Sequence, residues 1–129
     1  MKIEVSNGEL LDKISILQIK CIKIQDKFKL ANVVKELNIL MEAITHDEAI
    51  MKVHNSELFR KLYAVNYSLW GVEDAIREKE YREEFDDQFV HYARQVYQLN
   101  DIRAKLKKEI DEQTGSTLTE EKHYTEHSN

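Results

Sequence analysis

The scarcity of chain-breaking residues constrains this sequence more than any other feature. Its 129 residues include no proline and only three glycines, Gly8, Gly71 and Gly115. Sheet proteins turn every few residues, and their turns recruit glycine and proline. The length suits one domain, and the 42% of hydrophobic residues is enough for a core and too much for a disordered chain. We therefore expect an all-α fold built from long helices.

Apolar spacing and capping residues predict about four helices. Four segments repeat apolar residues at alternating spacings of four and three, which is the pattern of one helix face. Ser6 and Glu9 form an S-x-x-E capping box, Ser56 caps the third helix, Asp86 or Asp87 caps the fourth, and Gly115 ends it. Residues 45–55 lack a clear period and are expected to form the main loop.

The expected architecture is a bundle of elongated helical hairpins. A helical domain spans residues 1–115, and residues 116–129 form a polar tail, either free or docked on the bundle. The fourth helix, at about 26 residues, would be roughly 39 Å long, which outgrows a compact globule of this size. We therefore expect a homo-oligomer that forms through the long helices.

Charge and hydropathy exclude several partners. The formal net charge of −5 disfavours binding to a nucleic acid polymer. No apolar run reaches 18 residues and the N-terminus does not resemble a signal peptide, so we expect no membrane partner and a cytoplasmic location in a bacterial or phage-infected cell. Cys21, the single cysteine, allows no internal disulfide.

Three polar stripes beside the apolar faces are the candidate binding residues. Two lysines on the first helix lie two helical turns apart, and they either bind a phosphate or border the core. The third helix carries an amide, an indole, a carboxylate and a guanidinium on one stripe. This stripe suits either a planar polar ligand or a contact with another protein. Polar residues at core positions of the fourth helix either contact the ligand or form a buried network with the third. The stripes comprise Lys13 and Lys20; Asn66, Trp70, Glu73 and Arg77; and Tyr97, Asn100, Asp101 and Arg103.

No catalytic, metal-binding or cofactor-binding constellation is expected. A carboxylate-bridged di-metal bundle needs two E-x-x-H motifs, and the only one here, Glu120 to His123, lies in the tail. His123 and His127 are four residues apart there, which we interpret as a coincidence. The chain has no glycine-rich phosphate loop, and Cys21 lies on an apolar face, a poor place for a nucleophile.

Several motifs together resemble a domain-of-unknown-function family of short, all-helical bacterial and phage proteins. The motifs are S-x-G-E-L from Ser6, V-N-x-x-L-W-x-x-E-D from Val65, N-D-x-R from Asn100 and E-E-K-x-Y from Glu120. The resemblance runs almost end to end and implies a helical fold throughout. It implies no activity, but its polar motifs coincide with the three stripes.

Three hypotheses about function follow. The first is a non-catalytic oligomer that holds a small phosphorylated or nucleotide-like ligand between helices; in a phage it would sequester a host immune signalling nucleotide. The second is a structural or adaptor protein whose polar stripes pair with one another. The third is an enzyme acting on a nucleotide or nucleotide-sugar, with acid–base groups among Glu73, Asp74 and Asp101.

Overall fold

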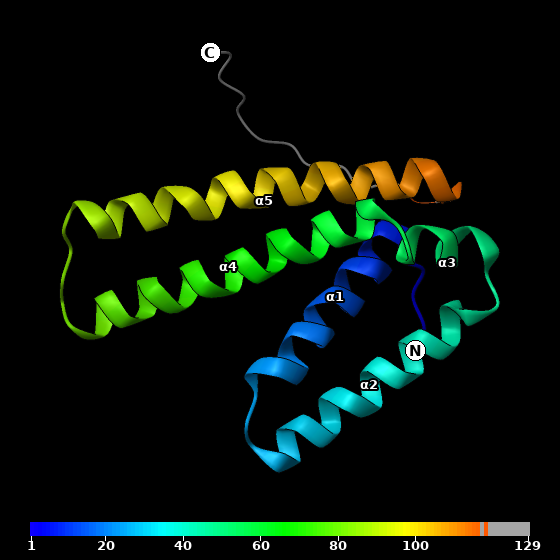
Figure 1. Ribbon diagram of the computed structural model, residues 1–129, viewed down its shortest axis with the longest axis horizontal. Helices are drawn as coiled ribbons and strands as arrows, with labels where there is room; N and C mark the ends of the chain where they lie inside the picture. Colours follow the sequence, from blue (N-terminus) through cyan, green and yellow to red (C-terminus); the bar gives the residue numbers. More distant parts are fainter. Residues whose placement is uncertain (117, 119–129) are drawn as a thin grey trace.

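The computed structural model describes residues 1–116 and 118. This part of the chain forms five α-helices and contains no strand, which confirms the all-α expectation. Figure 1 shows two antiparallel hairpins, one of α1 and α2 and a longer one of α4 and α5, with the short α3 between them. The helices are α1 (Asn7–Lys23), α2 (Lys27–Thr45), α3 (Glu48–His54), α4 (Glu57–Tyr81) and α5 (Asp87–Thr114).

Three of the four helix caps that the sequence predicts form as expected. Ser6 Oγ accepts a hydrogen bond from the Glu9 amide at 3.0 Å, and Asp86 Oδ1 accepts one from the Phe89 amide at 2.9 Å. Gly115 ends α5 in the left-handed conformation, with φ of 64°. Ser56 is the N-cap of α4, but its hydroxyl donates backwards to the Val53 carbonyl and makes no cap hydrogen bond.

The expectation of about four helices joined by a main loop over residues 45–55 is wrong. A fifth helix, α3, occupies most of that loop. Asp47 caps it by accepting a hydrogen bond from the Ile50 amide at 3.0 Å. Ile50 and Val53, three residues apart, are both buried. Two buried residues are too few to define a period, so burial in the core stabilises a seven-residue helix that its own pattern does not predict.

The hydrophobic core lies at one end of the molecule. It is formed where the start of α1, the end of α2, α3, the start of α4 and the end of α5 meet, around Leu11, Ile14, Ile44, Leu62 and Ile110. No residue of α4 after Leu69 is buried, and none of α5 before Leu106. The connections α1–α2 and α4–α5 therefore lie away from the core, as Figure 1 shows.

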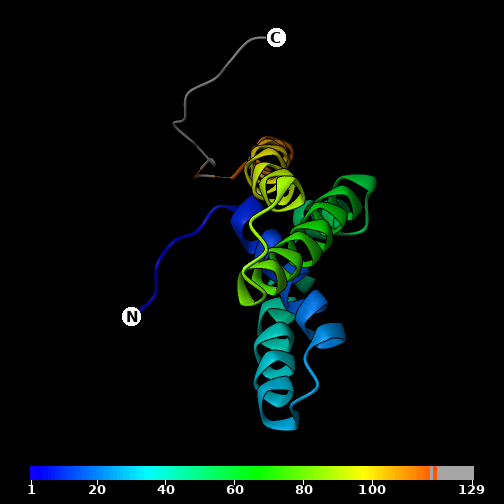
Figure 2. The ribbon, with the colours of Figure 1, turned by 90° about the vertical axis from the view of Figure 1, so that its left-hand side faces the viewer.

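The helix α1 is the central element of the fold. It packs against α2, α4 and α5, and Figure 2 shows the α1–α2 hairpin projecting from the longer α4–α5 hairpin.

Across the residues that the structure describes, no helix combines the length and apolar character needed to cross a membrane.

Candidate anion-binding pocket between α1 and α5

Three polar contacts hold the start of α1 on the last turns of α5. The Arg103 guanidinium binds the Asp12 carboxylate, Lys107 Nζ lies 2.7 Å from Glu9 Oε2, and Asp111 Oδ1 accepts a hydrogen bond from the Gly8 amide at 2.6 Å. The three α5 residues are spaced by four, so they share one face of that helix. Glu9 thus does not complete the expected capping box, because its carboxylate pairs with Lys107.

The Asp12 carboxylate is the centre of a buried polar network. Its side chain is 1% exposed and binds Arg103 through two parallel hydrogen bonds, from Nε to Oδ1 at 2.9 Å and from Nη2 to Oδ2 at 2.5 Å. Asn66 Nδ2 donates to Asp12 Oδ1 at 2.9 Å and to Ser15 Oγ at 2.7 Å. A buried carboxylate is stable only when paired in this way, so the network ties α1, α4 and α5 together.

A pocket of about 260 Å³ opens beside this network. Lys13 and Lys20 reach it from one stripe of α1, and Arg103 reaches it from α5, while Ile16 and Leu17 supply the apolar wall. The Asp12 and Glu9 carboxylates complete the lining, so the formal charge of the lining side chains is +1. A pocket that concentrates three cationic side chains in an acidic protein suits a small anion.

The two lysines differ in their pairing. Lys13 Nζ lies 3.1 Å from Glu36 Oε1 on α2, and both side chains are about half exposed, so the pair is weak and exchangeable. The half-buried Lys20 side chain forms no ion pair with any described residue. Lys20 is therefore the cation best placed to meet an anion from solution.

The other residues of the predicted stripes lie in different surroundings. Asn66 faces α1 within the network, and Asn100 Oδ1 accepts a hydrogen bond from Arg103 Nη1 at 3.4 Å. The following four do not line the pocket described above: Trp70, which is half-buried, and Glu73, Arg77 and Tyr97, which are exposed. Asp101 is half-buried on α5. The structure thus brings together Lys13, Lys20 and Arg103, supported by Asn66 and Asn100.

Sequence reasoning did not include Asp12 among the binding residues. The pattern that could have identified Asp12 is its place on one face of a helix. Gly8, Asp12, Ser15 and Ile19 follow one another at spacings of four, three and four, and all four are buried in α1. A carboxylate on a buried helix face requires a cationic partner elsewhere in the chain. The sequence does not identify which cation this is.

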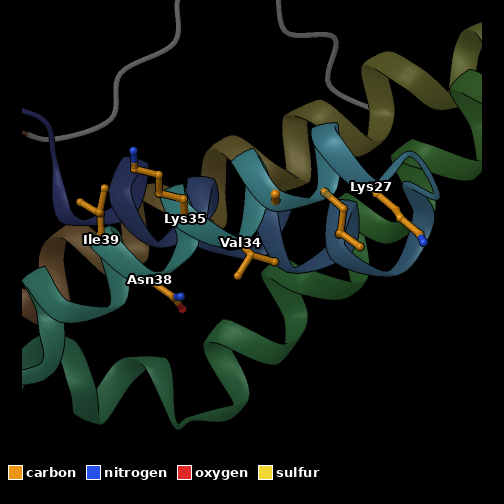
Figure 3. A pocket seen from close by; sticks show the side chains of 7 residues that line it. Lys27, Val34, Lys35, Asn38 and Ile39 are labelled. Carbon is orange, nitrogen blue, oxygen red and sulfur yellow. The ribbon is translucent and has the colours of Figure 1, made fainter.

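Two other hollows lie outside the pocket between α1 and α5. The larger, of about 700 Å³, runs along the outer face of α2, and Figure 3 shows its labelled side chains, from Lys27 to Ile39, all rising from that one helix. It is therefore an open helix face, without an opposing wall among the described residues. The other, of about 270 Å³, lies at the α4–α5 turn beside Lys79 and Tyr92.

Ion pairs organise the α4–α5 turn. Lys79 Nζ lies 2.8 Å from Asp86 Oδ2 and 3.3 Å from Glu84 Oε2. The hydrogen bond from Lys79 lowers the pKa of Asp86, and the same bond raises the pKa of Lys79. These contacts close the turn.

Within residues 1–116 and 118, no cluster of three or more histidine, cysteine, aspartate or glutamate side chains is arranged to hold a metal ion.

One comparison with known proteins places the chain in a family. The family described as "Family of unknown function (DUF6165)" matches residues 1–128. The chain belongs to this family. The match covers every helix and the whole candidate pocket, and it agrees with the resemblance to a domain-of-unknown-function family seen in the sequence. No curated protein and no solved structure matches the chain.

Proposed function

We propose that this chain binds a small phosphorylated or nucleotide-like ligand in the pocket between α1 and α5, without converting it. The observation that carries the proposal is the convergence of Lys13, Lys20 and Arg103 from two helices on one pocket. Lysine ammonium groups bind phosphate as point charges, and an arginine fork binds it with directional hydrogen bonds. Asp12 and Asn100 hold the guanidinium in place, so little side-chain entropy is lost when an anion arrives.

The pocket's carboxylates argue against catalysis. A general acid or base must be free to exchange a proton with the substrate. Asp12 is bound by Arg103 and Asn66, and Glu9 is paired with Lys107. The enzyme hypothesis offers Glu73, Asp74 or Asp101 as acid–base groups, and none of the three lines this pocket.

The size of the pocket limits how much of a ligand it can enclose. A volume of about 260 Å³ lies just below the usual range for small-molecule sites, so it suits a phosphate group with a small organic part. A nucleotide would extend beyond the pocket, and the stacking role suggested for Trp70 stays a prediction. The sequence suggests one biological role for such binding: in a phage, the protein would sequester a host immune signalling nucleotide.

Calorimetric titration of the protein with inorganic phosphate, pyrophosphate and AMP tests the proposal. We expect binding of at least one probe, and Lys20→Gln should weaken it about tenfold, the effect of losing one charged contact of about 1.5 kcal/mol. Lys52→Gln, which removes an exposed lysine of α3 far from the pocket lining, should leave binding unchanged. Failure of all three probes to bind, or equal effects of both variants, would contradict the proposal.

The structural hypothesis is the second candidate, and the buried network favours it. The bonds among Asp12, Asn66, Arg103 and Asn100 are those expected if the polar stripes serve only to join helices. Under this hypothesis, Lys20→Gln changes neither stability nor any ligand titration. The same experiment therefore separates the two candidates.

We also propose that the protein is a homo-oligomer. Large apolar side chains that α4 and α5 leave exposed support this proposal, because their burial against a second copy would stabilise an oligomer. They are Tyr67, Tyr81, Val90, Tyr97 and Ile102. Sedimentation at micromolar concentration should give a mass above the 15.3 kDa of the monomer.

A further inference from the structure

The two hairpin connections carry opposite charges. Residues 22–29, the basic tip, hold three lysines against Asp26, a formal charge of +2, and Lys20 lies one turn away. Residues 78–87, the acidic tip, hold six acidic residues against two basic ones, a formal charge of −4. The two hairpin connections of this acidic chain thus carry net formal charges of opposite sign.

Each tip also exposes two large hydrophobic side chains. Ile22 and Phe28 are 64% and 86% exposed at the basic tip, and Tyr81 and Phe85 are 86% and 59% exposed at the acidic tip. The cause is the position of the core, which lies at the opposite ends of these helices. Apolar side chains surrounded by charges of one sign have the composition of an interface with a polar rim.

Much of the charge at the tips is not neutralised within the chain. Among residues 1–116 and 118, Lys27 and Lys29 form no ion pair, and neither do Glu80 and Glu83. Lys79, in contrast, neutralises Glu84 and Asp86 within the acidic tip. The remaining charges point to a partner of opposite sign at each tip.

We infer that the basic tip of one copy docks on the acidic tip of a second copy. Charge complementarity selects this partner, because each chain presents both surfaces in equal number. An anionic lipid surface or nucleic acid would also attract the basic tip, but the acidic tip and the net charge of −5 oppose its approach. Charge sets which tips pair, and the four exposed hydrophobic side chains supply the buried area.

The fold allows this contact to close as a dimer. In Figure 1 the two tips lie at the periphery, and the helices lie on one side of the line that joins the tips. A two-fold axis between the tips exchanges their positions and places the second copy on the empty side. Both contacts then form at once, so the dimer leaves no tip unpaired. The inference rests on the proposed homo-oligomer and is independent of ligand binding.

Charge reversal of each tip tests the contact by sedimentation velocity in low and high salt. Two double variants, Lys27→Glu with Lys29→Glu and Glu80→Lys with Glu83→Lys, should each weaken the dimer at least tenfold. The first makes the basic tip negative, so both tips repel, and the second brings the acidic tip to a net charge of zero, so the attraction between the tips is lost. An equimolar mixture of the two variants should form a dimer again. The wild-type dimer should weaken as salt rises. Lys52→Glu with Lys61→Glu is the matched control away from the tips, and it should leave the dimer intact.

The alternative outcomes are distinct. A monomer under all conditions would overturn both this contact and the oligomer, while ligand binding is judged separately by calorimetry. An oligomer that tolerates both reversals would overturn the contact alone. Monomeric protein that sediments with phosphatidylserine vesicles, and loses this ability on reversal of the basic tip, would assign that tip to a lipid surface instead and overturn the inference.

Discussion

Among single residues, Gly8 sets how closely α1 approaches α5. A Cβ atom at this position would lie 2.3 Å from the Lys107 carbonyl oxygen and 2.8 Å from Asp111 Oδ1. Such contacts force the two backbones apart and break the 2.6 Å hydrogen bond from the Gly8 amide to Asp111. Glycine is therefore required by the close approach of a neighbouring backbone, since its own φ is not in the left-handed region.

Gly8→Ala should lower the free energy of unfolding by about 1–3 kcal/mol, the usual cost of overpacking, despite the higher helix propensity of alanine. Gly71→Ala is the matched control, because no atom lies within 4 Å of its added Cβ. This control should raise the free energy of unfolding by about 0.5–1 kcal/mol. Urea denaturation measures both, and a stabilising effect of Gly8→Ala would contradict the close-approach explanation.

Asp12 is the second residue on which the packing of α1 depends. Asp12→Ala should lower the free energy of unfolding by about 3 kcal/mol, because Arg103 and Asn66 lose the carboxylate they bind. Adding Arg103→Met should recover part of this loss by removing the unmatched cation. Losses that simply add in the double variant would show that the two side chains act independently.

At the element scale, the α4–α5 connection depends on the ion pair between the half-buried Lys79 and the exposed Asp86. Because Lys79 lowers the pKa of Asp86, the favourable effect of the ionised carboxylate is present above its ordinary pKa and disappears as the pH falls through the lowered value. Because the pKa of Lys79 is raised, its effect is present below its ordinary pKa and disappears as the pH rises through the raised value. The turn is therefore tightest between these two limits.

Lys79→Gln should return the pKa of Asp86 toward its ordinary value of 3.8, because the largest cause of the shift is removed. The backbone hydrogen bond from Phe89 remains and should keep the pKa slightly low. The carboxyl carbon chemical shift of Asp86, followed by NMR against pH, measures the change. An Asp86 titration identical in the variant and the wild type would contradict this account.

Because the hydrophobic core lies at one end of the molecule, the free energy of local unfolding differs from one end of the whole molecule to the other. Buried residues of α4 and α5 are confined to the halves near Leu62 and Ile110, and the outer halves pack only as a two-helix hairpin. Elements with few buried contacts open locally at a lower free energy than the core. Both tips therefore belong to the least stable part of the fold.

Native-state hydrogen exchange should show this gradient. Amides of residues 11–19, 58–69 and 106–111 should exchange slowest, and those of residues 74–95 should exchange faster at low protein concentration. Raising the concentration should slow exchange at both tips if copies dock there, while the core is unaffected. Uniform protection along α4 at every concentration would contradict the gradient.

Features that depend on residues close together in the chain could be predicted from the amino-acid sequence. The lack of proline, the apolar periods and the capping residues depend on neighbours within a few positions. They predicted the helical class, the helices α1, α2, α4 and α5, the cap at Ser6 and a cap at Asp86 or Asp87. The stripe of Lys13 and Lys20 is also local, because two residues seven apart on a helix share a face. The apolar spacing did not predict the helix over Glu48–His54, because that segment is stabilised by its burial in the core.

Contacts between side chains that are distant in the sequence depend on how the helices pack. Arg103 lies 91 positions from Asp12, and Asn66 lies 54 positions from it, so no spacing rule relates them. The same packing turned Asn66 from the Trp70 stripe toward α1 and paired Glu9 with Lys107. The physical reason is that helix periodicity fixes the face on which a side chain lies. Which faces meet is decided by burial of the whole core and by the need of each buried charge for a partner.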